Sequence, residues 1–189
     1  MLAIQLLLFF LATGLIAYIS RASLLSPRTH GFYRFFAWEI ILILFLRNIP
    51  VWFNNPFAWY QLISWSLLII CCFPVILGVR MLKQAGKPLA EASSPQRQDE
   101  TLFEFEKTTA LVTGGIYRYI RHPLYSSLLL LAWGIFFKRP DLTGLLLAPT
   151  ASLFLTVTAS IEEQENIRYF GPAYLEYIKS TRKFIPFLF

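Results

Sequence analysis

The chain has 189 residues, of which 56% are hydrophobic, 17% are aromatic and only 15% are charged. About a quarter of the residues in soluble domains are charged, so this composition excludes an ordinary soluble domain and predicts a membrane protein. The basic residues behind the net charge of +6 flank apolar segments, which favours anionic lipid headgroups over nucleic acid as their partners.

Apolar stretches of membrane-spanning length recur along the chain and predict an all-α, multi-pass fold with about five transmembrane helices. The first stretch lacks the basic leader of a secretory signal, so we expect a helix that is retained. Glu39 and Arg47 interrupt the second stretch, and Lys138 to Asp141 predict a tight hairpin turn between the last two. The expected spans cover residues 2–19, 35–53, 57–82, 124–138 and 141–161.

Polar segments divide what we interpret as a single membrane domain. Residues 1–83 would hold three transmembrane helices, residues 84–108 a cytoplasmic loop and residues 109–189 the catalytic core. The loop contains GKPLAEASSPQRQDE, whose content of proline, serine and charge is typical of a surface segment. Cys71 and Cys72 are adjacent in an apolar run without metal-ligand spacing, so we interpret them as small packing residues and predict no metal site.

The distribution of lysine and arginine predicts the orientation. Fourteen of the 17 basic residues fall on one side of the expected spans, leaving Arg47, Lys138 and Arg139 on the other. Because short cytoplasmic loops are enriched in basic residues, the N-terminus is expected outside and the C-terminus in the cytoplasm.

The C-terminal tail EEQENIRYFGPAYLEYIKSTRKF is amphipathic, with a break at Gly171-Pro172. We expect two short interfacial helices that close a cytoplasmic pocket. Their apolar face would comprise Ile167, Phe170, Tyr174, Tyr177 and Ile178.

The stretch GGIYRYIRHPLYSS carries the first candidate site residues. Pro123 suits the first position of a helix, with His122 at its cap. Gly114 and Gly115 permit a tight turn and the close approach of a ligand, and free helix amides beside Arg121 would bind a carboxylate or phosphate.

A plainer interpretation of the same stretch stays open. Arg118 and Arg121 would extend to lipid headgroups, and the neighbouring tyrosines would form an aromatic belt at the membrane boundary. These tyrosines are Tyr117, Tyr119 and Tyr125.

The second candidate segment is SIEEQEN, at the end of the fifth expected span. If the last two spans form a hairpin, its acids return to the level of Arg121 and His122. We expect Glu162 to face this site, where an amino-acid head group would suit it. Glu165 is expected instead to pair with Arg118, Arg121 or Arg168, or to face water.

The motifs LVTGGIYRYIRHPLY and EEQENIRYFGPAYLEY, followed by RKFIP, resemble the isoprenylcysteine carboxyl methyltransferase family and the related phospholipid methyltransferases. These are membrane enzymes that use S-adenosylmethionine, and the resemblance covers residues 109–186. It implies a bacterial or archaeal inner-membrane protein with catalytic residues Arg121, His122 and Glu162. The cofactor-binding residues that it implies are Leu111, Val112, Tyr117, His122, Pro123, Tyr125 and Glu162.

Two positions depart from the family pattern. Thr109, which with Ala110 falls in the implied cofactor-lining strip, stands where the family often has histidine. Thr158 stands four residues before Glu162, where the members that methylate prenylcysteine carboxylates have an arginine. The partner of that carboxylate is therefore missing, which weakens the case for a prenylcysteine acceptor.

The resemblance thus implies methyl transfer from S-adenosylmethionine to a lipophilic acceptor at the membrane surface. Aligning the reactants contributes roughly 7 to 11 kcal/mol in such reactions, so no nucleophilic triad is needed. Two alternatives stay open: an NADPH-dependent membrane reductase of related fold, and a non-catalytic membrane scaffold. The sequence leaves the acceptor's identity and the oligomeric state undetermined.

Overall fold

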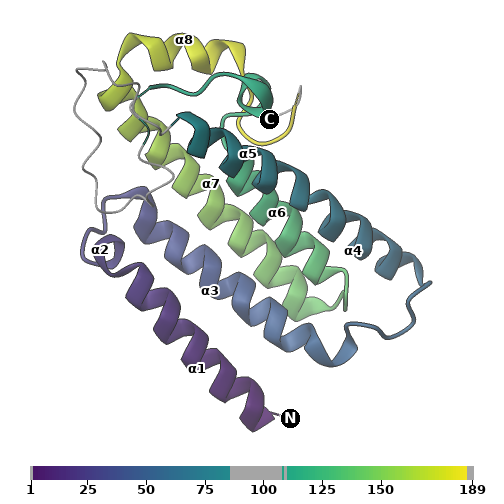
Figure 1. The fold of residues 1–189 in the computed structure, drawn as a ribbon. Coiled ribbons are helices and arrows are strands. Elements are labelled where there is room, and N and C mark those ends of the chain that lie inside the picture. The colour runs from purple at the N-terminus through teal and green to yellow at the C-terminus, as the bar shows by residue number, and fades with distance from the viewer. Residues whose placement is uncertain (1, 86–107, 109, 187–189) are drawn as a thin grey trace.

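The structure, a computed structural model, describes residues 2–85, 108 and 110–186. Within these ranges the regular secondary structure is helical throughout, which confirms the all-α prediction. The long helices run side by side, and α8 crosses one end of them (Figure 1). The elements are α1 (Leu2–Ile19), α2 (Arg21–Leu24), α3 (His30–Asn48), η1 (Ile49–Val51), α4 (Trp59–Ile70), α5 (Cys72–Ala85), η2 (Gly115–Arg118), α6 (Pro123–Phe136), α7 (Leu142–Phe170) and α8 (Pro172–Ser180).

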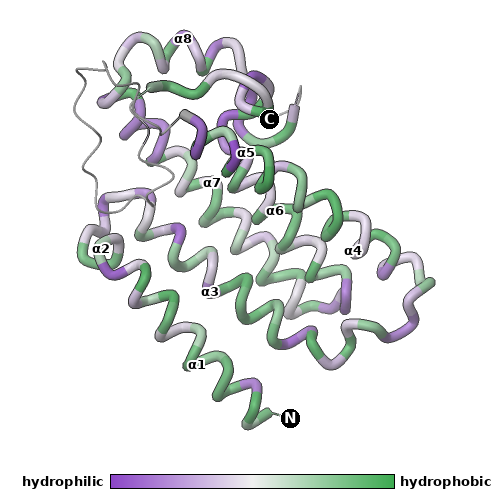
Figure 2. Tube along the Cα trace, in the orientation of Figure 1, coloured by the Kyte–Doolittle hydropathy of each residue, from purple (hydrophilic) through white to green (hydrophobic). Residues whose placement is uncertain are grey.

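Three stretches of the described residues are long and apolar enough to cross a membrane: Leu2–Ile19, Trp59–Gln84 and Leu142–Phe170. Helix α6 is apolar but has only 14 residues, and α3 carries the interrupting charges Glu39 and Arg47. Five spans therefore remain a prediction, of which three have the expected length and hydropathy. Apolar residues cover α1 and α4, whereas hydrophilic residues gather where α8 crosses the bundle (Figure 2).

The expected span at 57–82 consists of two helices in line, α4 and α5, separated at Cys71. Pro74 lacks an N–H and its ring conflicts with the carbonyl of residue 70, so a continuous helix is disfavoured there. The side chain of Cys71 is half-buried, but that of Cys72 is exposed. The interpretation of Cys72 as a packing residue is therefore wrong.

Helix α7 extends to Phe170 and is 29 residues long. The expectation of two separate interfacial helices after residue 161 is wrong, because the first of them continues the preceding helix. Between Ile161 and Phe170 the sequence has no glycine or proline that would end the helix, and Gly171, with φ of 61°, ends it. The break expected at Gly171-Pro172 is confirmed, because α8 begins directly after it.

Helices α3 and α7 form the centre of the bundle through a face of small side chains. Ala148, Ala151 and Ala159 on α7 are fully buried, as is Ala37 on α3. Small residues let two helix backbones approach closely, which is the usual way in which helices associate within a membrane. The close approach brings the N-terminal turn of α3 against the last turns of α7, where the acidic residues lie.

The predicted hairpin turn between α6 and α7 is confirmed, and charged groups stabilise it. The side chain of Asp141 caps α7 by accepting a hydrogen bond from the Gly144 amide at 2.9 Å, and it pairs with Arg47 of α3. Lys138, in the same turn, is buried: its Nζ donates to Gln61 at 3.0 Å and lies 3.3 Å from the ring centre of Trp65. The charge that interrupts α3 therefore fastens the far end of the bundle.

The cap at Asp141 gives a stability prediction. Asp141→Ala removes both the cap and the ion pair, and it should lower the free energy of unfolding by about 1–2 kcal/mol. Asp141→Asn keeps a capping oxygen but loses the charge, so it should cost less. Thermal unfolding in detergent measures both, and equal melting temperatures for wild type and Asp141→Ala would contradict the prediction.

The same carboxylate should make part of this stability depend on pH. Burial alone would raise the pKa of Asp141, but the Gly144 amide and the Arg47 guanidinium outweigh it and hold that pKa below its ordinary value. The pKa of Asp141 is lower in the folded protein than in the unfolded chain, where it is about 3.9. The carboxylate therefore contributes its full stabilisation above a pH of about 3.9, and this contribution is lost as the pH falls through the pKa of the folded protein. The difference between wild type and Asp141→Asn should shrink over that acidic range.

Candidate functional site

The turn that leads into α6 depends on one glycine. Gly115 has φ of 55°, a left-handed conformation that side chains disfavour, and a Cβ there would lie 2.3 Å from Sδ of Met81. The predicted tight turn is confirmed. The close approach at this glycine is to Met81 of α5, however, and not to space that a ligand could fill.

His122 lies at the cap position of α6 and Pro123 is the first helical residue, as predicted. The imidazole makes no capping hydrogen bond. It stacks instead on Tyr125, with ring centres 5.5 Å apart, between two carboxylates of α7. Nδ1 lies 3.9 Å from Oε2 of Glu162, and Nε2 lies 3.3 Å from Oε1 of Glu163.

Arg121 is held by protein groups. Its Nε donates to Oε1 of Glu163 at 2.8 Å, and a terminal nitrogen donates to the carbonyl of Thr181 at 2.6 Å. The backbone amides of Arg121 and His122 donate to the carbonyls of Arg182 and Lys183. The C-terminal segment therefore uses the Arg121 guanidinium and the two amides before α6, and the expected anion site at the first amides within α6 stays a prediction.

The C-terminal segment from Thr181 to Phe184 is fixed against the start of α6 and the end of α7. Ser126 donates to the Phe184 carbonyl at 2.8 Å, and Lys183 lies 3.1 Å from Glu163 and 3.0 Å from Ser160. Glu163 is thus shared by three basic or imidazole side chains. These hydrogen bonds and ion pairs join the C-terminal segment RKFIP to the segment RHPLY at the start of α6.

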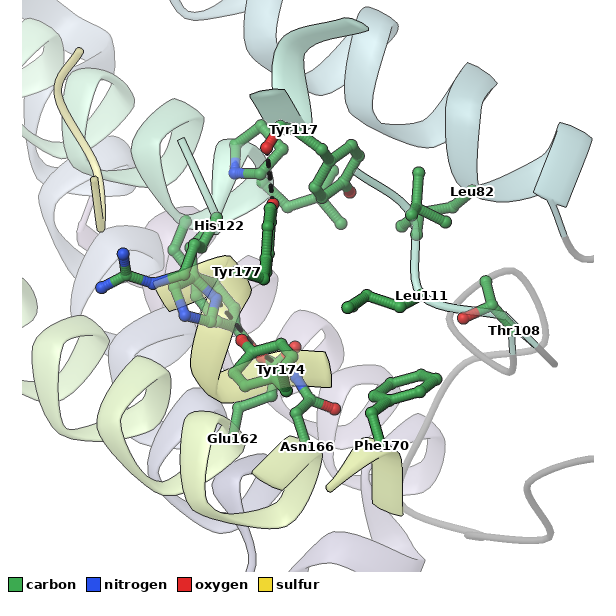
Figure 3. A pocket seen from close by; sticks show the side chains of 15 residues that line it. Leu82, Thr108, Leu111, Tyr117, His122, Glu162, Asn166, Phe170, Tyr174 and Tyr177 are labelled. Carbon is green, nitrogen blue, oxygen red and sulfur yellow. Dashed lines mark hydrogen bonds and ion pairs between the residues drawn. The ribbon is translucent and has the colours of Figure 1, made fainter. Parts of the chain in front are cut away.

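Glu162 lies on the other side of the His122 ring and points towards α6. Its Oε2 accepts a hydrogen bond from the Tyr125 hydroxyl at 2.5 Å. Asn166 and Phe170 follow at intervals of four residues, so all three share one face of α7 (Figure 3). The amide of Asn166 donates to the Tyr174 hydroxyl at 3.4 Å, which joins this face to α8.

Helix α8 supplies two buried phenols. The Tyr177 hydroxyl donates to the carbonyl of Tyr117 at 2.6 Å and so holds α8 against the turn before α6 (Figure 3). Burial raises the pKa of Tyr174 and of Tyr177, so both remain neutral hydrogen-bonding groups at physiological pH.

These segments surround a small cavity of about 80 Å³. Each of the predicted site residues lines it: Leu111, Val112, Tyr117, Arg121, His122, Pro123, Tyr125 and Glu162. The structure adds Leu82, Thr108, Leu124, Asn166, Phe170, Tyr174 and Tyr177 to the lining.

Several expectations about neighbouring residues need correction. Glu165 bonds to His30 of α3, with Nδ1 and Oε2 2.6 Å apart, a partner that the expectation for this residue did not include. Ala110 is exposed and is absent from the lining, where Thr108 takes its place. Thr109 lies outside the described residues, as does most of the loop expected at 84–108.

Sequence reasoning missed His30 and Glu163 because their partners come from other helices. The apolar spacing of the tail did include Phe170, Tyr174 and Tyr177, but only as the apolar face of interfacial helices and not as individual site residues. A signal was present in the break at Gly171, which turns α8 back over α7 and so directs its aromatic face to the cavity. Among the described residues, no group of three or more metal-ligating side chains is placed to hold a metal ion.

Part of the chain matches a known protein family. A family model described as phospholipid methyltransferase matches residues 93–173, which include the cavity residues from Thr108 to Phe170. Residues 93–173 belong to this family. This match agrees with the family predicted from the motifs, and the apolar helices are typical of an integral membrane protein.

Two curated relatives agree with this assignment. A methanethiol S-methyltransferase of Pseudomonas deceptionensis is 23% identical over 132 residues, which cover 67% of this chain and 43% of the relative. A protein-S-isoprenylcysteine O-methyltransferase of Schizosaccharomyces pombe is 28% identical over 136 residues, covering 71% and 53%. The chain therefore spans about half the length of these relatives. No solved structure matches it significantly.

The buried ion pair of Arg121 gives a second prediction. The Arg121 and Glu163 side chains are only 8% and 11% exposed, so Arg121→Ala leaves a buried carboxylate without its main partner. We expect the free energy of unfolding to fall by about 3–5 kcal/mol. Thermal unfolding in detergent measures the loss.

Arg118→Ala is the matched control, because Arg118 lies one turn earlier and is exposed. Its melting temperature should stay close to that of wild type. Similar losses in the two variants would mean that the pair with Glu163 does not hold the site together.

Proposed function

We propose that the chain is an S-adenosylmethionine-dependent methyltransferase that acts on a lipophilic acceptor at the membrane surface. One observation carries this proposal: two family motifs about 35 residues apart enclose a single cavity, which the eight predicted catalytic and cofactor-binding residues line. In the proposed roles, Glu162 and His122 face the reacting groups. Arg121 is a positioning residue rather than the catalytic residue that the resemblance implied, because Glu163 and Thr181 hold its guanidinium.

The chemistry of the lining fits this cofactor. An amino-acid head group needs a carboxylate and neutral hydrogen-bonding groups, which Glu162, Asn166 and Tyr174 provide. An adenine ring needs flat apolar surface, and Phe170 and Leu111 lie at the same end of the cavity (Figure 3). The aromatic rings of Tyr117 and Tyr125 can stabilise a cationic sulfonium by about 0.5–2 kcal/mol.

S-adenosylmethionine, when bound, supplies a methyl group that its sulfonium already activates. The protein then has to hold both reactants in line and keep water out, and alignment contributes roughly 7–11 kcal/mol in such reactions. The hydrogen bonds and ion pairs of Glu163 hold the start of α6 against the end of α7, so these two walls of the cavity keep their positions. The hydrogen bond from Tyr177 to Tyr117 fixes the α8 wall of the cavity.

The setting supports an acceptor that arrives through the membrane. Large apolar side chains cover the outer faces of α1, α4 and α5, whereas the cavity lies at the hydrophilic end under α8 (Figure 2).

The N-terminus lies at the opposite end of the bundle from α8 (Figure 1), which agrees with an N-terminus outside and a cytoplasmic cavity. One relative is named for transfer to the sulfur of methanethiol and the other for transfer to an oxygen of isoprenylcysteine, so both acceptor chemistries enter the proposal.

Cofactor binding is the direct test. Glu162→Gln keeps the shape of the side chain but removes its charge, so we expect S-adenosylhomocysteine to bind about 10- to 100-fold more weakly, the loss of a charge-assisted hydrogen bond. Isothermal titration calorimetry of the purified protein in detergent measures the affinity. Transfer of label from methyl-tritiated cofactor to membrane lipid extracts measures the reaction.

Glu176→Gln is the matched control, because Glu176 is exposed on α8 and pairs only with Lys179 in the described contacts. It should bind S-adenosylhomocysteine like wild type. Absence of binding heat with the wild-type protein, or binding of NADPH in its place, would overturn the proposal in favour of a scaffold or a reductase.

A further inference from the structure

His30 and Glu165 form a buried pair behind the cavity. Glu165 of α7 takes both donors of the first residue of α3: its Oε2 lies 2.6 Å from Nδ1 of His30, and its Oε1 accepts from the His30 amide at 3.1 Å. His30 is fully buried, and it lies at the end of α3 nearest the cavity. One carboxylate thus fixes both the position and the orientation of the ring.

The other ring nitrogen of His30 has no hydrogen-bond partner among the described residues. Leaving a buried polar atom unpaired costs about 1–3 kcal/mol. Three further atoms share this condition, on Glu39, Arg47 and Asn48, but they lie in the middle or at the far end of α3. Among the described residues, Nε2 of His30 is therefore the buried side-chain atom without a hydrogen-bond partner that lies at the cavity end of α3.

Glu162 is the acidic residue that lines the cavity one helical turn before Glu165. It interacts electrostatically with both His30 and His122. These are the two histidines of the whole chain, and they stand at the start of α3 and at the cap of α6. The charged groups that act on His30 are Glu162 and Glu165 of α7 and Arg34 of α3.

The orientation of the ring decides which chemistry Nε2 can serve. Because the Glu165 carboxylate accepts the proton on Nδ1, the neutral ring presents a lone pair at Nε2. A lone pair takes up a proton, so it serves an acceptor that must lose one. A carboxylate acceptor loses none, and Thr158, whose hydroxyl donates to the Phe154 carbonyl at 2.7 Å, offers it no positive charge.

We propose that His30, held by Glu165 and acting through Glu162, receives the proton released when this enzyme methylates a thiol. The thiol S–H bond breaks, the proton passes by way of Glu162 to Nε2 of His30, and the electron pair stays on the thiol sulfur. That pair forms the new bond to the methyl carbon, while the pair of the old carbon–sulfur bond remains with the cofactor's sulfur. The inference rests on the proposed function and adds the acceptor class.

Two thiols of different acidity test the proposal. 1-Butanethiol is protonated at neutral pH and needs a base, whereas thiophenol is largely ionised and does not. His30→Gln should slow methylation of 1-butanethiol by about 10²–10⁴-fold, the usual contribution of a positioned base, and the rate should recover as pH rises. Methylation of thiophenol should change less than about 10-fold, and Glu165→Gln should act in the same direction as His30→Gln.

A second readout does not depend on turnover. With S-adenosylhomocysteine bound, the ultraviolet difference absorbance of the thiolate should appear when wild type binds 1-butanethiol and should be absent with His30→Gln. Calorimetry with S-adenosylhomocysteine shows whether each variant keeps its cofactor site, and Glu176→Gln is again the control. Equal losses for both thiols, or a pH profile for His30→Gln that matches wild type, would overturn the proton role.

The two proposals fail in different ways. A wild-type protein that binds S-adenosylhomocysteine but methylates neither thiol would overturn the inference about His30 and leave the proposed function standing. A wild-type protein that does not bind S-adenosylhomocysteine would overturn both.

Discussion

The site end of the structure depends on how three carboxylates within one turn of α7 are satisfied. A buried charge without a partner costs several kcal/mol, so Glu162, Glu163 and Glu165 each require donors from elsewhere in the fold. Glu162 takes the Tyr125 hydroxyl of α6, Glu163 takes Arg121 and Lys183, and Glu165 takes His30 of α3. One acidic turn thereby fastens the start of α6, the C-terminal segment and the start of α3 to α7.

This arrangement is possible only because the helices approach closely below it. The alanine face of α7 and the buried Ala37 of α3 bring the two backbones near enough for a short glutamate side chain to reach the first residue of α3. At the far end, the same pair of helices is joined by Arg47 and Asp141. The walls of the cavity that α7 and α8 provide are therefore supported by packed helices.

The sequence was sufficient for features that local chemistry determines. Pro123 starts α6, Gly171 ends α7 and Asp141 begins it, because each residue type has a strong positional preference. The eight residues predicted for the site share one cavity because the resemblance carried long-range information that periodicity lacks. Partner choice among like residues could not be predicted: Glu163 and Glu165 are both near basic residues in sequence, and only helix packing decides that one takes Arg121 and the other His30.

The length of α7 suits the lipophilic acceptor and the water-soluble cofactor of the proposed function. About 20 helical residues cross the hydrocarbon core of a bilayer, at a rise of about 1.5 Å each. Counted from Leu142, that distance ends beside Glu162, and the rest of the 29-residue helix projects beyond it. In the proposed function, the carboxylate that lines the cavity would thus lie at the membrane boundary, where an apolar acceptor would remain in lipid while its reactive atom meets polar groups. Moving the acidic turn by one helical turn in either direction would place it in hydrocarbon or in water, and in neither place could both reactants reach it.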